Sequence, residues 1–190
     1  RPTHVDKFRR IVDIKEDGSF RLNMDYFAYT YSTRRTFSRK WEQLFGRKQR
    51  PKETELDDFH ADIAHSGQKI VEEIMVKMAA HVHKVTGLDN VCIAGGVGLN
   101  CVANWRILQE SGFKNIFIQP AAGDSGGALG VAFYIYNSVL RRPRTYAMSH
   151  ALLGPLFNDH EIIEVLGRNK AVYELIGDES ELIDRTARLI

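Results

Sequence analysis

Residues 90–129 read NVCIAGGVGLNCVANWRILQESGFKNIFIQPAAGDSGGAL and contain one pattern twice. Each copy begins with a short apolar run that includes β-branched residues, passes through a glycine-rich turn and ends in a helical stretch. The first copy is the run 90–94, the turn 95–98 and a helix over 100–110, and the second is the run 115–120, the turn 121–127 and a helix to about Leu140. Two consecutive strand-turn-helix units predict a parallel or mixed sheet with helices packed on it, and therefore an α/β domain.

The segments on either side of this region predict further elements. Two short β-rich runs joined by Glu16-Asp17-Gly18-Ser19 predict a β-hairpin over residues 10–22. Apolar residues at steps of three, four or seven predict one long helix over 58–86 that ends at Gly87. Nearer the carboxyl end we expect a capped helix at Asn158–Glu161, a short strand at 171–176 and a last helix capped by Asp178 with Glu181.

Length and composition restrict the class of protein. The chain has 190 residues, of which 44% are hydrophobic and 26% charged, which predicts one globular domain with part of a second. No apolar run approaches the roughly 18 residues of a membrane span, and the first residues do not resemble a signal peptide, so we expect a cytoplasmic protein. Two cysteines, Cys92 and Cys101, suggest reduced thiols. The absence of an initial Met and the apolar pattern still running at Ile190 predict an internal piece of a longer polypeptide.

Positive charge is concentrated in one stretch. The net charge is +2, but residues 34–52 hold eight basic residues against the single acid Glu42. Aromatic residues are mixed into this basic run, so it could bind nucleic acid through phosphate contacts and stacking. A solvated surface loop or a groove for an acidic substrate is the favoured interpretation.

The two glycine-rich turns are the strongest candidates for a binding site. Glycines between a strand and a helix let the backbone approach a ligand closely, while the following helix presents unpaired amides to an anion such as phosphate. No Lys-Ser or Lys-Thr pair follows the glycines, which excludes a P-loop, and Cys101 stands where a dinucleotide motif needs its third glycine. Two turns in tandem favour one nucleotide held by both, although close helix packing alone could also require the glycines.

Two polar residues in these turns admit a functional and a structural interpretation. Asp124 could ligate a metal ion, or it could cap the helix that follows. Asn100 could offer its amide to a nucleotide, or it could cap the first helix. Gly123-Asp124-Ser125-Gly126-Gly127 also spells the nucleophile motif of trypsin-like proteases, with His81 upstream, but both residues fall on predicted helices, so Ser125 is interpreted as a helix N-terminal residue. The seven histidines have no spacing typical of a metal site.

The paired motifs Ile93–Asn104 and Gln119–Gly130 resemble those of the carbamoyltransferases of the nodulation and antibiotic-tailoring type. The likeness extends to the segments Asp17–Phe20, Trp41–Gly46, Asp62–Ala64 and Leu153–Pro155, and so covers most of the chain. The resemblance implies an ASKHA-type half-domain, related to actin and sugar kinases, with a mixed sheet flanked by helices. It further implies the use of ATP and carbamoyl phosphate to make a carbamoyl-adenylate, followed by carbamoyl transfer to a hydroxyl of a sugar- or antibiotic-like acceptor.

The same resemblance implies roles for particular residues and a division of the chain. The nucleotide would be bound by Gly95, Gly96, Val97, Asn100, Gly123, Gly126 and Gly127, and Asp124 would be a carboxylate ligand of a divalent metal, expected to be iron. No catalytic residue is assigned. Residues 1–145 would be the second lobe of a Kae1-like transferase domain, and 146–190 the connection to a YrdC-like domain together with the truncated start of that domain.

The expected partners follow from that division. They are the nucleotide, the acceptor, and the rest of the same polypeptide, namely an amino-terminal lobe and the YrdC-like domain, without which the piece is expected to be inactive. No membrane partner is expected, and nucleic acid is not favoured. Two alternatives stay open: an ASKHA-type kinase or ATPase that uses the same turns, and a non-catalytic nucleic-acid or partner-binding module that uses the basic run 34–52.

Overall fold

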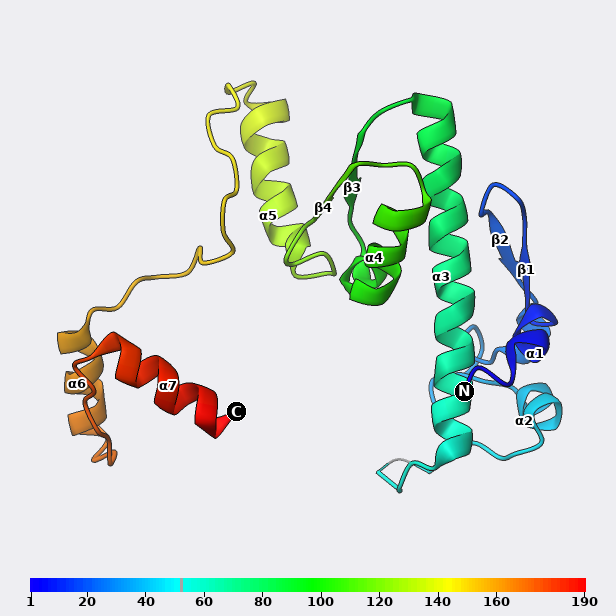
Figure 1. The fold of residues 1–190 in the computed structure, drawn as a ribbon, viewed down its shortest axis with the longest axis horizontal. Coiled ribbons are helices and arrows are strands. Elements are labelled where there is room, and N and C mark those ends of the chain that lie inside the picture. The colour runs from blue at the N-terminus through cyan, green and yellow to red at the C-terminus, as the bar shows by residue number, and fades with distance from the viewer. Residues whose placement is uncertain (52) are drawn as a thin grey trace. The chain divides into compact units, whose positions relative to one another are not determined.

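The computed structural model describes residues 1–51 and 53–190, so Lys52 of the basic run lies outside the described residues. The chain divides into two compact units, Arg1–Arg144 and Thr145–Ile190, shown from blue to red in Figure 1. The first unit is a mixture of helices and short strands, and the second contains two helices.

The first unit contains helices and four short strands along the described chain. They are α1 (Val5–Arg9), β1 (Val12–Ile14), β2 (Phe20–Leu22), η1 (Met24–Tyr26), α2 (Arg39–Phe45), α3 (Asp58–Thr86), β3 (Asn90–Ile93), η2 (Gly96–Leu99), α4 (Cys101–Glu110), β4 (Asn115–Ile118), α5 (Gly126–Phe133) and its continuation η3 (Tyr134–Val139). The second unit holds α6 (Asp159–Arg168) and α7 (Glu179–Leu189).

Helix α3 is the long helix that the sequence predicts, with the same bounds. It begins in a capping box, in which Asp57 accepts from the backbone amide of His60 and the His60 side chain accepts from the amide of Asp57. It ends at Gly87, whose φ of +65° is the left-handed conformation that glycine adopts at little cost. The sequence prediction is confirmed because the helix has clear start and stop signals and 29 residues of helical periodicity.

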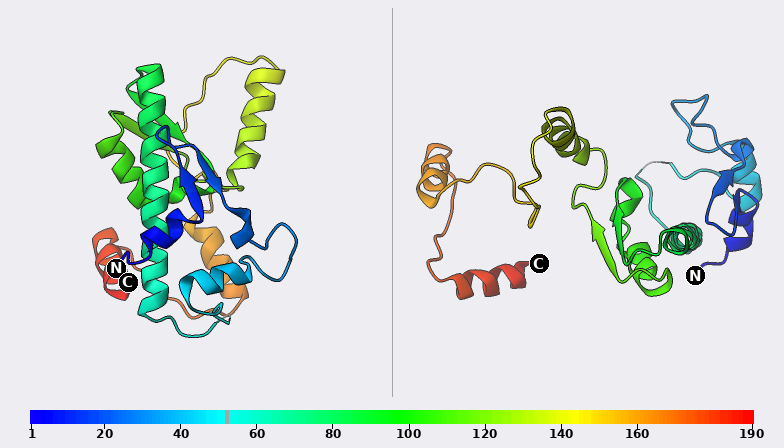
Figure 2. Two further views of the ribbon diagram at one scale, coloured as in Figure 1. Left: turned by 90° about the vertical axis from the view of Figure 1, so that its right-hand side faces the viewer. Right: turned by 90° about the horizontal axis from the view of Figure 1, so that it is seen from above.

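Two hydrophobic clusters use different faces of α3. Ile70 on one face packs with Ile11, Val12 and Phe45 from α2 and the hairpin region. Ala79 on another face packs with Ile107 of α4 and Phe113. Figure 2 (right) shows α3 nearly end-on, with the blue hairpin on one side and α4 with its strands on the other. The helix therefore separates the two halves of the core.

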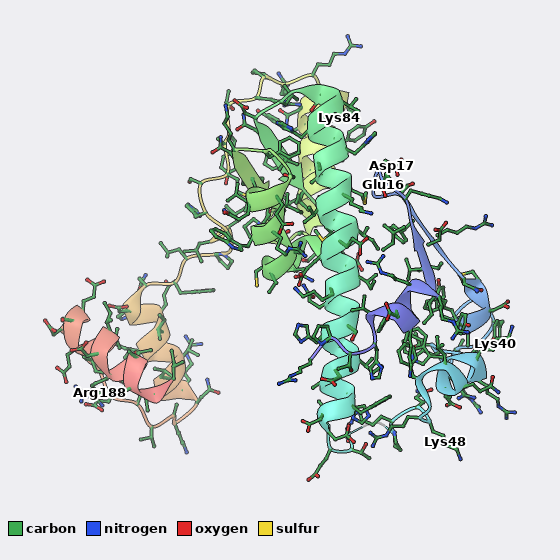
Figure 3. The ribbon with its side chains drawn as sticks, turned by 45° about the vertical axis from the view of Figure 1, so that its right-hand side comes forward. Glu16, Asp17, Lys40, Lys48, Lys84 and Arg188 are labelled. Atoms are coloured by element: carbon green, nitrogen blue, oxygen red, sulfur yellow. The ribbon has the colours of Figure 1, made fainter. Side chains whose placement is uncertain are left out.

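Strands β1 and β2 form the predicted antiparallel hairpin, with Asp13 opposite Arg21. At its tip the Asp17 carboxylate accepts from the backbone amide of Ser19 at 2.9 Å and from its hydroxyl at 2.7 Å. Gly18 has a φ of +81° and lies against α3, where a Cβ atom would be only 2.3 Å from the backbone nitrogen of Met78. Figure 3 labels Glu16 and Asp17 at this tip, beside the upper half of α3.

Strands β3 and β4 pair in parallel, with Asn90 opposite Asn115 and Ile93 opposite Ile118. This pairing confirms the parallel arrangement predicted from the tandem strand-turn-helix units. The prediction of one mixed sheet is corrected, because the described residues form two separate two-stranded sheets, one antiparallel and one parallel. Helix α3 lies between the two pairs, which explains why β2 and β3 do not meet. The ASKHA half-domain stays a prediction.

The second unit confirms two predicted helix starts and corrects one strand. Asn158 and Glu161 form a capping box at α6, and the Asp178 side chain accepts from the amide of Glu181 at α7. The strand expected at 171–176 is absent, and those residues lie outside any helix or strand. Val172 in this segment is fully exposed, so the apolar run has neither a strand partner nor a core to cover it within the described part of the unit. Among the described helices, none is long and apolar enough to cross a membrane.

Replacing Gly18 should test the contact between the hairpin and α3. We expect Gly18→Ala to lower the free energy of unfolding by about 2–4 kcal/mol, because the new methyl group would meet the α3 backbone and L-residues disfavour this φ. Gly46→Ala is the matched control, since Gly46 has a φ of +78° but open space around it. It should cost about 1–2 kcal/mol, the backbone penalty only. Equal losses for the two variants in urea unfolding would contradict the close contact.

Candidate functional site

The two glycine-rich turns lie side by side at the carboxyl ends of β3 and β4. The backbone amide of Gly95 in the first turn donates to the carbonyl of Ala122 in the second, at 2.8 Å. A Cβ atom on Gly98 would lie 3.4 Å from the Cβ of Ala122, and one on Gly123 would lie 3.8 Å from the Cα of Gly96. Parallel neighbouring strands end at the same edge of a sheet, which explains the meeting. The structure thus brings together all the predicted nucleotide-binding glycines in one region.

The first turn leaves two backbone amides without an acceptor among the described residues. Gly95 has a φ of +102°, and the short helix η2 follows it at once. The Gly98 amide donates back to the Gly95 carbonyl at 2.9 Å, and the Asn100 amide to the Val97 carbonyl at 3.0 Å. Within the described residues, the amides of Gly96 and Val97 have no acceptor. Such unpaired donors at the start of a helical turn are suited to phosphate oxygens.

The second turn uses the amides of two of its glycines internally. Gly126 donates to the Gly123 carbonyl and Gly127 to the Asp124 carbonyl, both at 3.0 Å. The amides of Gly123, Asp124 and Ser125 have no acceptor in the part of the chain that the structure describes. A ligand at this turn could therefore accept hydrogen bonds from the amides of residues 123–125. The amides of Gly126 and Gly127 are already used, so these two glycines would only allow the ligand to approach the backbone closely.

Asp124 has an exposed carboxylate that the fold does not use. Across residues 1–51 and 53–190, that carboxylate has no hydrogen bond and no ion pair, so it does not cap α5. Ser125 occupies the position before α5, as predicted, but its hydroxyl forms no capping hydrogen bond. The described residues contain no group of three or more His, Cys, Asp or Glu side chains that could hold a metal. The Asp124 carboxylate would supply one ligand group to a metal ion, and the metal itself stays a prediction.

Asn100 caps α4, and it also contacts α3. Its Oδ1 accepts from the backbone amide of Ala103 at 3.1 Å and from Nε2 of Gln68 at 3.0 Å. Its Nδ2 donates to Oε1 of Gln68 at 2.8 Å. The capping interpretation is confirmed, and the contact with a nucleotide stays a prediction.

A buried carboxylate that was not predicted from the sequence joins α3 to α4 next to Asn100. Glu72 of α3 is 1% exposed, and it accepts from Gln68 at 3.1 Å and from Lys69 and Arg106 at 2.9 Å each. Burial raises the pKa of the Glu72 carboxyl, but the hydrogen bonds from Lys69, Arg106 and Gln68 lower it by more, so its pKa lies below the ordinary 4.5. One feature of the sequence could have indicated that Glu72 faces the core. Gln68 and Glu72 continue, at helical spacing, the stripe of the apolar residues Met75 and Ala79.

Asn104, one turn further along α4, holds the first glycine-rich turn in place. It is 6% exposed, and its Nδ2 donates to the carbonyl of Gly98 at 2.7 Å. Its buried Oδ1 has no partner among the described residues. Because only the NH₂ group can face a carbonyl oxygen, the orientation of the Asn104 amide is fixed.

The structure does not assemble the other sequence candidates into a site. The ring of His83 packs edge-on against Phe113 at 5.1 Å, and His60 belongs to the cap of α3. Among the described residues, Ser125 has no hydrogen bond to a histidine, as expected if the protease motif is a coincidence.

The basic run 34–52 is partly neutralised by nearby acids. Three of its members form ion pairs of 2.6–2.8 Å: Arg35 with Glu42, Lys40 with Asp25, and Arg47 with Asp57. Figure 3 labels Lys40 and Lys48 on this part of the chain. These pairs favour a solvated surface over a continuous positive surface for nucleic acid.

The site that the structure shows consists of two glycine-rich turns of an α/β domain, joined by a hydrogen bond, with unpaired amides of the kind that can donate to an anion. The chain belongs to the carbamoyltransferase family: residues 4–133 match the family model described as "Carbamoyltransferase N-terminus". The match includes β3, β4 and both glycine-rich turns.

Three relatives illustrate the similarity. The uncharacterized protein sll1178 of Synechocystis sp. is 41% identical over 196 residues, which cover 100% of this chain and 32% of the relative. The nodulation protein NolNO of Sinorhizobium fredii is 27% identical over 85% of this chain and 22% of the relative. The nodulation protein NolO of Bradyrhizobium diazoefficiens is 43% identical over 44% of this chain and 15% of the relative. The chain therefore spans about a third or less of the length of these relatives.

Neutralising Glu72 should weaken the connection between α3 and α4. We expect Glu72→Gln to lower the free energy of unfolding at pH 7 by about 2–3 kcal/mol, because Lys69 and Arg106 lose their buried counter-charge. Glu110→Gln, which removes the exposed partner of Arg106, is the control and should cost less than about 1 kcal/mol.

The effect of Glu72→Gln should depend on pH in a defined direction. The pKa of Glu72 is lower in the folded chain than its ordinary value of 4.5, so the stabilisation is complete above that pH and is lost as pH falls through the folded pKa. The stability difference between wild type and Glu72→Gln should thus be constant near neutrality and shrink on acidification. A difference that grew in acid would contradict this assignment.

The two adjacent glycines of the second turn should respond differently to alanine. A Cβ atom on Gly126 would lie 2.1 Å from the carbonyl oxygen of Ala121, whereas nothing lies within 4 Å of one on Gly127. We expect Gly126→Ala to destabilise the chain by about 2 kcal/mol. Gly127→Ala should be neutral, or stabilising by up to about 1 kcal/mol through helix propensity. Thermal unfolding of the two variants would show whether the turn has this geometry.

Proposed function

We propose that this chain is part of an ATP-dependent O-carbamoyltransferase. The reaction would use ATP and carbamoyl phosphate to form a carbamoyl-adenylate, with release of pyrophosphate from ATP and of inorganic phosphate from carbamoyl phosphate. It would then pass the carbamoyl group to a hydroxyl of a sugar- or antibiotic-like acceptor and release AMP. The observation that carries the proposal is the family match over residues 4–133, which includes both glycine-rich turns. The free amides of those turns support it, because they are the donors that a nucleotide phosphate requires.

In this proposal the turns bind the nucleotide and contribute no reacting atom. The amides of Gly96 and Val97 would donate to one phosphate group, and those of Gly123, Asp124 and Ser125 to oxygens nearer the second turn. Gly95 and Gly126 would keep the backbone close enough for those contacts. Amides fixed before the ligand arrives stabilise negative charge without having to reorganise.

The chemistry of transfer is consistent with this division of roles. The acceptor hydroxyl would attack the carbamoyl carbon, the bond from that carbon to the AMP oxygen would break, and the hydroxyl proton would leave to solvent or a base. A metal held in part by Asp124 would supply a Lewis acid for the carbamoyl oxygen. No protein nucleophile is needed, so neither cysteine nor Ser125 has to react.

The remaining parts of the machinery would come from the same polypeptide outside these 190 residues. An amino-terminal lobe would supply the other metal ligands, and a YrdC-like domain would form the carbamoyl-adenylate. We expect the 190 residues by themselves to bind nucleotide weakly and to transfer no carbamoyl group, because a pocket without its opposing wall buries little of the ligand. A cytoplasmic location fits a reaction that depends on ATP and carbamoyl phosphate.

The products of the reaction distinguish a carbamoyltransferase from an ASKHA-type kinase or ATPase. The assay uses the whole natural polypeptide that contains these residues. We expect pyrophosphate release from ATP that depends on carbamoyl phosphate, with a carbamoylated acceptor detected by mass spectrometry. An ASKHA-type kinase or ATPase would instead release ADP with no need for carbamoyl phosphate, and that result would contradict the proposal.

Substitution at Asp124 tests whether this site belongs to the reaction. Asp124→Asn should lower carbamoyl transfer on the order of 100-fold, because it removes a charge next to the reacting group. Asp89→Asn changes another exposed acid, which lies before β3 and pairs with Lys114, so it should leave the transfer rate unchanged. Equal rates for Asp124→Asn and wild type would exclude the proposed role of Asp124.

A further inference from the structure

A buried charge on Glu72 fixes the orientation of the Gln68 amide. Glu72 accepts hydrogen bonds but cannot donate when ionised, so only the NH₂ group of Gln68 can face it, at 3.1 Å. Gln68 and Glu72 are four residues apart on α3 and therefore share one face of that helix. The side-chain carbonyl of Gln68 must then point away from Glu72.

That orientation is passed on to Asn100 by two hydrogen bonds. One Nε2 hydrogen of Gln68 goes to Glu72, and the other goes to Oδ1 of Asn100 at 3.0 Å. The Oε1 atom of Gln68 accepts from Nδ2 of Asn100 at 2.8 Å. Both hydrogen-bond donors of the Gln68 amide are thus used, and the two amides form a reciprocal pair.

Within the described residues, this pairing leaves Asn100 with one free donor. Its Oδ1 already accepts from Gln68 and from the amide of Ala103, and one Nδ2 hydrogen is bonded to Gln68. The second Nδ2 hydrogen has no acceptor. Helix α4 is also tied to α3 by the contact between Arg106 and Glu72, so the position of Asn100 relative to α3 is set at two points.

We propose that Gln68 is a positioning residue, which holds Asn100 so that its remaining Nδ2 hydrogen is directed to an acceptor atom of the bound nucleotide. The inference rests on the proposed function, since it takes the glycine-rich turns as the nucleotide site. It adds a chemical restriction: Asn100 offers a donor only, so the ligand atom it meets is an oxygen or an unprotonated nitrogen. A ligand group that can only donate would find no partner at this residue.

Variants of the whole natural polypeptide that contains these residues can separate positioning from stability. Gln68→Met keeps the length of the side chain but removes all three hydrogen bonds. We expect it to weaken ATP binding about tenfold, the equivalent of one hydrogen bond. Asn100→Ala should weaken ATP binding by a similar factor, and the double variant should bind no more weakly than Asn100→Ala.

A neighbouring substitution provides the control. Lys69→Met removes one of the donors to Glu72, as Gln68→Met does, but within the described residues Lys69 forms no hydrogen bond with Asn100. It should leave ATP affinity within about twofold of wild type while lowering stability in urea. Weakening of ATP binding by Lys69→Met and Gln68→Met to the same degree would overturn the proposal, because the effect would then be general destabilisation.

A measurement on the wild-type protein avoids any variant that fails to fold. Selective ¹⁵N labelling of Asn reports the side-chain amides, and the pair of Nδ2 hydrogen signals missing from the spectrum of Asn100→Ala belongs to Asn100. On addition of ATP, the hydrogen that is not bonded to Gln68 should shift downfield and the bonded one should stay in place. A shift of neither hydrogen, or a shift of the bonded one only, would overturn the proposal.

The outcomes also separate this inference from the proposed function. Loss of ATP affinity in Asn100→Ala with wild-type affinity in Gln68→Met would reject the positioning role and leave the nucleotide site intact. Wild-type affinity in Asn100→Ala, Asp124→Asn and Gly126→Ala together would reject the nucleotide site at these turns, and with it the positioning role.

Discussion

The burial of one carboxylate between two helices governs how α4 packs on α3. Glu72 is withdrawn from water on α3, where an ionised group is costly unless donors surround it. The donors come from both helices, Lys69 and Gln68 on α3 and Arg106 on α4. Helix α4 can therefore pack on α3 only where Arg106 reaches this carboxylate, and that placement carries the beginning of α4, with Asn100, to the edge where the two glycine-rich turns meet.

Local signals account for the part of the fold that the sequence predicted. The 29-residue helix α3 has strong periodicity and clear end signals, and the hairpin turn depends on Gly18 at a positive φ, so neighbouring residues decide both. The errors concern contacts between distant residues. A single mixed sheet was expected, but α3 packs between the two strand pairs, and the apolar segment at 171–176 has no partner strand in the described part of its unit. Periodicity predicts an element, whereas its neighbours depend on the tertiary structure.

The candidate site shows the same difference between features that local sequence predicts and features that depend on tertiary packing. The glycines, Asn100 and Asp124 could be singled out because turns between a strand and a helix have a recognisable composition, and the two turns do meet. Gln68, Glu72 and Arg106 were not singled out, because a Gln and a Glu on a long helix are typical of a solvated face. The stripe that they continue toward Met75 and Ala79 is only a weak signal, and Glu72 is buried where α4 packs on α3 and Arg106 reaches its carboxylate. The family match over residues 4–133 places the chain among the carbamoyltransferases.

The hydrogen bond from the Gly95 amide to the Ala122 carbonyl has a consequence for ligand affinity. Two independent loops would each lose conformational freedom on binding, and that loss would weaken the complex. Because this bond joins the turns, and Asn104 further anchors the first one through the Gly98 carbonyl, much of that entropy has been lost during folding. The two turns then act as one preorganised surface, and a phosphate that contacts either turn meets the other already in position.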